Sequence, residues 1–254
     1  MKINVGKKIK KYAVAGFEVS EYEELSSTNT EAEQWPGEEL KDRKVILTFC
    51  QTQGRGQATN RWESEPGQNV SMTVVFCPER YEASRQFAVS MVCALGVCDF
   101  VGRYVEGASV KWPNDVYVGD RKICGILIEH TVGGAFIKRA LCGIGVNINQ
   151  TEFLSDAPNP VSLWQLTGKR MPLDKAVEEL LDCIGRRYGQ IEDYERLEKN
   201  FMACLYRRQG IHAWEDETGG FWASINRIDE YGRLVLRDTQ GKERVYGFKE
   251  VIYK

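Results

Sequence analysis

The sequence is poor in the residues that usually hold a metal ion. Only two of its 254 residues are histidine, and no two of its eight cysteines are spaced as a CxxC pair. Zinc sites are usually built from such pairs or from several histidines, so the usual zinc-site spacing is excluded. Most of the cysteines lie in apolar runs such as KICGIL and ALCGIG. We therefore expect small buried side chains in a reducing, cytoplasmic compartment rather than a disulfide framework.

Net charge and long hydrophobic runs are also lacking. The 34 basic and 36 acidic residues leave a formal net charge of −2, which excludes a globally basic nucleic-acid binder. The longest uncharged apolar run, residues 86–98, is too short to span a bilayer. The N-terminal residues combine lysines with early acidic residues and show no small-residue cleavage pattern, so a signal peptide is not expected. The partners predicted at this stage include neither nucleic acid nor a membrane.

Periodicity predicts several strands and a long helix in the first 150 residues. From residue 84 onward, apolar residues recur at the spacing of an amphipathic helix: Ala88, Met91, Val92 and Leu95. Strands are predicted at 43–51, 69–76, 108–112 and 135–149 (the last as one strand or a pair), and a hairpin turn at Gly119–Asp120. Because the runs ILIE and ALCGIG are apolar on both faces, we expect helices to cover this sheet.

The residue pattern of the sequence changes near residue 206, from helical spacing to short strands. Helical spacing predicts one helix over 174–193, with Asp174 as its N-cap, and a second over 194–206. Short strands and turns then alternate at regular intervals, which predicts a small antiparallel barrel. We therefore expect an α+β fold, with a mixed sheet backed by helices in a larger domain at 1–206 and a small barrel at 207–254.

The segment QTQGRGQATNRW, from Gln51 to Trp62, is the strongest candidate for a ligand-binding loop. Its glycines allow backbone N–H groups to approach an anion, and arginine adds a planar cationic group. Together they suit a phosphate or a carboxylate. The alternative is a surface loop with a glycine turn, since GRG alone is common. The segment is neither a Walker loop nor a GxGxxG motif.

Three further segments carry candidate residues. In KWPNDVYVGDRK, the residues Lys111, Asn114 and Asp115 crowd a strand end, and Lys122 follows the hairpin turn. In GIGVNIN, Asn147 alternates with apolar residues. In SSTNTEAE, Thr28 and Glu31 predict a capping box at a helix start. Each has a structural alternative: a solvated polar turn, a buried strand with satisfied amides, and a plain helix start.

Taken in this order and spacing, these motifs resemble the biotin protein ligases. The STN near the start, the QT-x-GRG loop ending in tryptophan, the KWPND–RK–GIL block and the GVNIN strand all match. The tail FWASINRIDEYGRLVLRDTQGKERVYGFKEV is similar to the C-terminal SH3-like barrel of that family. The resemblance covers the chain from about residue 22 to its end. It is carried most specifically by KWPND with the following RK.

The resemblance implies a two-step reaction. Biotin and ATP would give biotinyl-5′-AMP, and a lysine of a biotin carboxyl carrier domain would then take the biotin. Arg55, Lys111, Asp115 and Lys122 would be catalytic, with Asp115 taking the proton of the acceptor amine. Biotin contacts are implied at Ser27, Thr28, Asn29, Gln51, Gly54, Arg55, Gly56, Gln57, Lys122 and Gly125, and ATP contacts at Arg55, Trp62, Lys111, Asn114 and Asn147. Mg²⁺ would arrive with ATP, near Asn147, with no protein metal motif.

The sequence departs from the family pattern in the loop, where GRGRxGRxW is usual and GRGQATNRW stands here. Gln57, Thr59 and Asn60 replace an arginine, a glycine and an arginine. Because STN begins at Ser27, we expect no DNA-binding domain before it and no repressor function, and a homodimer remains open. Two alternatives are kept: lipoate–protein ligase chemistry on a similar core, and a non-catalytic biotin or nucleotide sensor.

Overall fold

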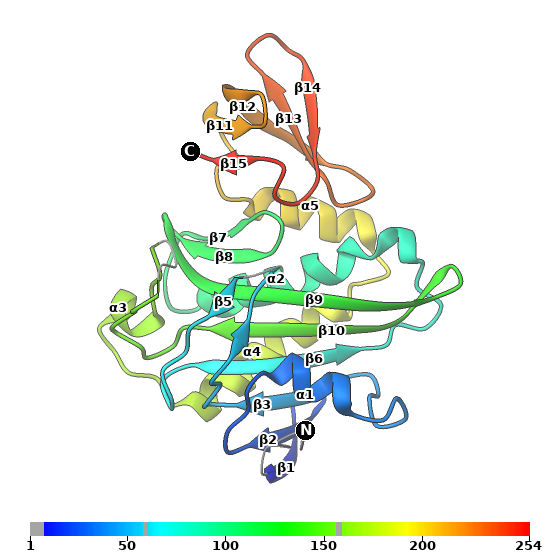
Figure 1. The fold of residues 1–254 in the computed structure, drawn as a ribbon, viewed down its shortest axis with the longest axis vertical. Coiled ribbons are helices and arrows are strands. Elements are labelled where there is room, and N and C mark those ends of the chain that lie inside the picture. Colours follow the sequence, from blue (N-terminus) through cyan, green and yellow to red (C-terminus); the bar gives the residue numbers. More distant parts are fainter. Residues whose placement is uncertain (1–7, 58–59, 156–158) are drawn as a thin grey trace.

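The computed structural model describes residues 8–57, 60–155 and 159–254 (Figure 1). Its larger sheet contains β1 (Lys8–Val14), β2 (Phe17–Tyr22), β3 (Lys44–Thr48), β6 (Val70–Phe76), β7 (Ala108–Lys111), β8 (Asp115–Val118), β9 (Arg121–Gly133) and β10 (Phe136–Val146). The helices are α1 (Thr28–Gln34), α2 (Phe87–Val101), α3 (Leu163–Thr167), α4 (Leu173–Tyr188) and α5 (Tyr194–Cys204), with a 3-10 turn at Ala83–Arg85. A two-stranded ribbon, β4 (Gly54–Arg55) and β5 (Arg61–Trp62), lies beside them.

Among the described residues, eight strands form one mixed sheet in the order β1-β2-β3-β6-β10-β9-β8-β7. The β2–β3 pair is parallel and the other neighbours are antiparallel. The expected mixed sheet is therefore confirmed, and the strand pair left open at 135–149 is the single strand β10. The hairpin predicted at Gly119–Asp120 joins β8 to β9, with Gly119 at φ +57°. The first hairpin, β1–β2, was not predicted.

Helix α2 is the core helix of the larger domain rather than an amphipathic surface helix. Every residue of α2 except Ser90 and Asp99 is buried, so the predicted one-sided stripe is wrong. Small and medium apolar residues around the whole helix allow it to pack on the sheet and on α4 at once. The stretch Ala83–Val101 is long and apolar enough to cross a membrane by length and composition, yet 72% of its window is buried in the structure. This burial is that of a helix packed inside a protein core.

Close contact between α2 and α4 makes Gly96 a test of core packing. A methyl group at Gly96 would lie 2.8 Å from Cα of Ile184. We expect Gly96→Ala to lower the free energy of unfolding by about 1–3 kcal/mol, because two packed backbones must separate. Urea denaturation measures the change, with Ser90→Ala on the same helix as the control. Equal stability of the two variants would contradict the close packing.

The other face of the sheet carries α1 and leaves room for a cavity. Helix α1 contacts β3, β6 and β10, so helices cover this face only in part. The helix is capped one residue earlier than predicted, since the Ser27 hydroxyl accepts from the N–H of Thr30 at 3.5 Å. Thr28 is therefore the first helical residue and is free to face the sheet. It has no capping role.

The C-terminal residues form a second sheet above the larger one (Figure 1). Its described strands run in the order β14 (Glu243–Tyr246), β13 (Leu234–Asp238), β12 (Gly219–Ile228), β11 (His212–Asp216) and β15 (Ile252–Tyr253). All neighbours are antiparallel, as predicted. Within the described residues no β14–β15 pairing closes this sheet, so the predicted barrel is seen as an open antiparallel sheet. The boundary at 206/207 stays a prediction.

The helices α4 and α5 begin with different N-cap residues. Pro172 is the N-cap of α4, and Asp174 lies in its first turn, so the predicted cap is wrong. Helix α5, the second of the two helices predicted over 174–206, is capped by Asp193, whose side chain accepts from the N–H of Arg196.

All eight cysteines lie in the described ranges and are free, five of them buried. Burial of most cysteines is confirmed, while the cytoplasmic location stays a prediction.

Candidate active site

A cavity of about 840 Å³ opens between the sheet, the Gly-rich loop and the C-terminal sheet. It brings together residues from several segments that are far apart in the sequence, from Ser27 near the N-terminal end to Tyr253 near the C-terminal end. Of the predicted site residues, those lining it are Ser27, Thr28, Asn29, Gln51, Arg55, Gly56, Gln57, Trp62, Lys111, Asn114, Asp115, Lys122, Gly125 and Asn147. The exception is Gly54, which lies in the β4–β5 ribbon opposite Trp62, where a side chain would overlap the Trp62 carbonyl. Thr59 lies outside the described residues.

One corner of the cavity is neutral and polar. The side chains of Ser27, Thr28 and Asn29 are buried at the start of α1. Gln51 is tied to this corner because its Oε1 accepts from the N–H of Thr28 at 2.9 Å. Below it, Thr73 Oγ1 on β6 lies 2.8 Å from Thr28 Oγ1 and 2.5 Å from Asn29 Oδ1. Helix start and sheet therefore hold these hydroxyls and amides in fixed positions.

Glycines on β9 and β10 form the floor beneath this corner and beneath Trp62. The strand register places Gly125, Gly145 and Ser71 in one row across β9, β10 and β6. A methyl group at Gly125 would lie 2.9 Å from Trp62 Cζ3, and one at Gly145 would overlap the same indole. The absent side chains therefore allow Trp62 to lie against the sheet backbone.

A third glycine, Gly143, supports the polar corner. Gly143 on β10 lies between Leu127 on β9 and Thr73 on β6. A methyl group at Gly143 would overlap Asn29 Oδ1. Asn29 can thus lie against the strand, with its Nδ2 donating to Glu129 Oε2 at 2.8 Å. The motif GIG was noted in the sequence, but its role as a backbone floor depends on the register.

The opposite edge of the cavity is cationic. Lys111 and Asp115 stand opposite each other in the β7–β8 strand register. Lys122 Nζ on β9 lies 2.6 Å from Asp115 Oδ2, in an ion pair. The backbone of Lys122 is fixed by hydrogen bonds with Asn159 and Val161, at 2.8 and 2.9 Å. Burial lowers the pKa of Lys111, with the cations Lys122 and Arg207 acting in the same direction and Asp115 opposing them. Two lysines and one carboxylate therefore meet at one end of the cavity.

Arg55 lines the same cavity but is engaged by carboxylates. Its Nη1 lies 2.7 Å from Glu33 Oε1 and its Nη2 lies 2.6 Å from Glu129 Oε1. The hydrogen bond to Glu33, together with the charge of Glu129, raises the pKa of Arg55. The three cations predicted to be catalytic are therefore two lysines at one edge of the cavity, Lys111 and Lys122, and an arginine, Arg55, held in ion pairs. These two ion pairs compete with any anionic ligand for the guanidinium of Arg55.

Two asparagines complete the site. Asn114 donates from Nδ2 to the carbonyl of Ile126 at 3.0 Å, which fixes its side chain beside β9. Asn147 donates to the carbonyl of Val161 at 3.1 Å, while its Oδ1 is buried without a hydrogen-bond partner among the described residues. Among the described residues, Trp62 Nε1 and Ser71 Oγ are also buried without a hydrogen-bond partner. Trp62, Ser71 and Asn147 all line the cavity, and buried polar groups are usually paired, so a polar ligand bound here would have three unpaired polar atoms close to it.

Sequence reasoning missed several lining or supporting residues. Glu129, which bridges Asn29 and Arg55, looked like the polar end of an apolar strand. Ser71 and Tyr117 carried no motif signal. The C-terminal segment contributes Phe248, Lys249, Val251, Ile252 and Tyr253 to the cavity wall. The alternation of side chains along a strand could have predicted which face of the sheet Ser71 and Tyr117 occupy. The contacts from the C-terminal segment depend on how the two sheets pack, which the sequence does not show.

The mixed sheet, with α2 and α4 on one face and α1 on the other, and the polar helix start and Lys–Asp edge around one cavity match what the resemblance to protein ligases implies. The biotin/lipoate A/B protein ligase family matches residues 22–147, and the chain belongs to this family of ligases. It is 28% identical over 227 residues to the biotin–[acetyl-CoA-carboxylase] ligase of Paracoccus denitrificans, covering 85% of this chain and 93% of that protein. The bifunctional ligase/repressor BirA of Bacillus subtilis is 24% identical over 249 residues, covering 93% of this chain and 74% of BirA.

The fold is that of solved biotin protein ligases. The structure of the Aquifex aeolicus enzyme in complex with biotin and ATP superposes with a TM-score of 0.77 at 21% identity, covering 93% of this chain and 99% of that one. The predicted fold class and the resemblance to biotin protein ligases are therefore confirmed.

Proposed function

We propose that this chain joins biotin to ATP as biotinyl-5′-AMP and transfers the biotin to a lysine on the biotin carboxyl carrier domain of a carboxylase. One observation carries the proposal: a single cavity has a neutral polar corner at Ser27, Thr28 and Gln51 and a cationic edge at Lys111 and Lys122. Hydroxyl and amide groups suit the uncharged ureido ring of biotin. Ammonium groups suit a carboxylate and phosphates.

The first step brings two anions together. A biotin carboxylate oxygen would attack the α-phosphorus of ATP, the bond to the β-phosphate oxygen would break, and pyrophosphate would leave. Lys122 is placed to offset the charge of both reactants, and Lys111 lies at the same edge. Such preorganised charges stabilise the transition state more strongly in a water-poor site than in water. Arg55 would join them after exchanging Glu33 or Glu129 for the substrate.

The nucleotide and its metal ion are assigned to Trp62, Asn114 and Asn147, which line the same cavity. Trp62 offers a flat ring and Asn114 a fixed amide, so we assign ATP contacts to them. Asn147 Oδ1 is a hard oxygen of the kind that coordinates Mg²⁺ or accepts a hydrogen bond from a Mg²⁺-bound water. Its lack of a partner among the described residues fits this group. Mg²⁺ bound to ATP would neutralise charge on the phosphate oxygens.

The second step needs a base. The acceptor amine would attack the biotinyl carbonyl carbon, the carbon–oxygen bond to AMP would break, and the amine proton would leave. Asp115 lies 2.6 Å from Lys122 at the site of the first step, so it is placed to orient the amine and to take its proton. A carrier domain is therefore expected to approach this edge of the cavity.

One assay separates the proposal from its alternatives. Purified chain, ATP, Mg²⁺ and an apo carrier domain are incubated with labelled biotin or labelled lipoate, and labelled carrier is measured. We expect label from biotin at least about tenfold faster than from lipoate, since a site built for a polar ring rejects an analogue that lacks it. Faster labelling by lipoate would indicate a lipoate ligase. Binding of biotin without adenylate or transfer would indicate a sensor.

Gly143→Ala tests the polar corner. The added methyl overlaps Asn29, which links Thr73 to Glu129, so the corner must rearrange. We expect KM for biotin to rise up to about tenfold, the equivalent of one lost hydrogen bond, with a smaller effect on kcat. Initial rates of pyrophosphate exchange at varied biotin measure this. Gly37→Ala is the control, since no atom lies within 4 Å of the added methyl; an unchanged KM for Gly143→Ala would refute the assignment.

A further inference from the structure

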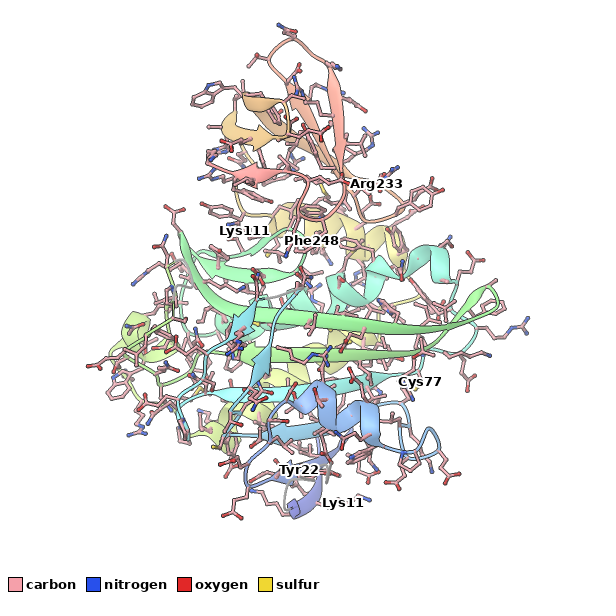
Figure 2. The ribbon with its side chains drawn as sticks, viewed as in Figure 1. Lys11, Tyr22, Cys77, Lys111, Arg233 and Phe248 are labelled. Carbon is pink, nitrogen blue, oxygen red and sulfur yellow. The ribbon has the colours of Figure 1, made fainter. Side chains whose placement is uncertain are left out.

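The last strand of the chain meets the cationic edge of the cavity. Figure 2 labels Lys111 and Phe248 close together where the C-terminal sheet lies above β7 and β8. Phe248 and Tyr253 both line the cavity. Two hydrogen bonds fix this joint: Trp112 Nε1 donates to the Gly232 carbonyl at 2.9 Å, and the N–H of Tyr206 donates to the Val110 carbonyl at 2.8 Å.

The ammonium group of Lys111 lies between two aromatic rings. Its Nζ is 4.9 Å from the ring centroid of Tyr117 on β8 and 4.9 Å from that of Tyr253 on β15. It also donates to Tyr117 Oη at 3.3 Å. A cation within about 6 Å of a ring centroid is attracted by the ring, and more so when it is withdrawn from water. Two segments that are far apart in the sequence therefore hold one lysine.

Tyr253 is itself fixed by the core of the C-terminal sheet. Its ring centroid lies 4.4 Å from that of Trp214, which is fully buried and donates from Nε1 to the Ala223 carbonyl at 3.0 Å. Tyr206 packs on Tyr253 at 5.9 Å. The ring over Lys111 is thus held in place by the second sheet.

We infer that Tyr253 is a positioning residue for Lys111, so that the last strand of the C-terminal sheet completes the active site of the larger domain. The inference rests on the proposed function for its catalytic consequence, and on the geometry alone for the contact itself. The groups around the ammonium are Tyr117 and Asp115 from β8, Lys122 from β9, Arg207 from the segment after α5, and Tyr253 from β15. Of these groups, Tyr253 is the one contributed by the second sheet.

The test compares Tyr253→Leu and Tyr253→Met, which remove the ring, with Tyr253→Phe, which keeps it. Trp222→Leu removes an aromatic residue that is 59% exposed on the same sheet, and it serves as the control. Pyrophosphate exchange should fall about 3- to 30-fold in the Leu and Met variants, the range expected for one lost cation–ring contact. It should stay within about twofold in the Phe and Trp222 variants. Circular dichroism checks that each variant is folded.

A double-mutant cycle separates positioning from general damage. In a Lys111→Met background, Tyr253→Leu should cost nothing further, because its effect acts through the lysine. An equal loss in both backgrounds would overturn the inference, and so would wild-type exchange in both ring-removing variants.

A second readout does not depend on ligase activity. Reductive methylation with mass spectrometry should label Lys111 several-fold faster in Tyr253→Leu than in Tyr253→Phe, while the exposed Lys175 reacts equally in both. Equal labelling of Lys111 would overturn the contact. If the wild-type chain makes no biotinyl-5′-AMP, the proposed function fails, and the labelling still decides whether Tyr253 holds Lys111.

Discussion

Replacing Lys122 with alanine is expected to lower the rate of biotinyl-5′-AMP formation by at least about 10²–10³-fold, the usual cost of removing one preorganised charge. The structure gives a second reason for a large effect. Lys122 Nζ is 2.6 Å from Asp115 Oδ2, so the substitution also leaves that carboxylate without its partner. An uncompensated carboxylate then faces two anionic substrates. Exchange of labelled pyrophosphate into ATP, which needs no acceptor, measures the step.

The control for this variant is Lys175→Ala, which removes a lysine that is 59% exposed on α4. That change should leave exchange within about twofold, because surface charges far from the site are screened. Near-normal exchange in Lys122→Ala would exclude the proposed role of Lys122 in adenylation. A matched loss in the control would point to an effect of net charge.

Asp115→Asn is expected to slow transfer to the carrier lysine by about 10²–10⁴-fold while slowing adenylation much less. A free lysine amine has a pKa of ~10.4 and is almost entirely protonated at pH 7, so transfer depends on a group that takes the proton. Asparagine cannot take it. Its amide oxygen can still accept from Lys122, which keeps that lysine in place for the first step.

The two steps are measured separately for this variant. Pyrophosphate exchange reports adenylation, and mixing preformed biotinyl-5′-AMP with apo carrier reports transfer. Asp174→Asn is the control, since the Asp174 side chain is 74% exposed in the first turn of α4. Equal losses in both steps would mean that Asp115 acts on Lys122 alone and not on the acceptor amine.

Much of the site was predictable because its residues come in short motifs at strand ends. Lys111, Asp115 and Lys122 lie on three consecutive strands joined by two tight hairpins, so local sequence is enough to bring them together. Asn147 follows β10 directly, and the loop from Gln51 is tied to the start of α1 by hydrogen bonds to Leu25 and Ser26. Each of these placements needs little more than strand pairing.

Other placements depend on packing between distant segments. The ion pairs of Arg55 with Glu33 and Glu129 join a loop, a helix and a strand, and no spacing in the sequence encodes them. The contact of Tyr253 with Lys111 depends on the orientation of the second sheet. The burial of α2 on all sides follows from its position between the sheet and α4, which periodicity alone does not reveal.

The glycine floor limits how this enzyme can be re-engineered. At Gly125, Gly143 and Gly145 no substitution can deepen the cavity, and any added side chain would displace Trp62 or Asn29. Variants that accept a bulkier acid must therefore be sought among wall side chains, such as Leu127, and not in the strands' glycines. Small-to-large changes in the floor would instead move Trp62 or Asn29, two of the residues that shape the site.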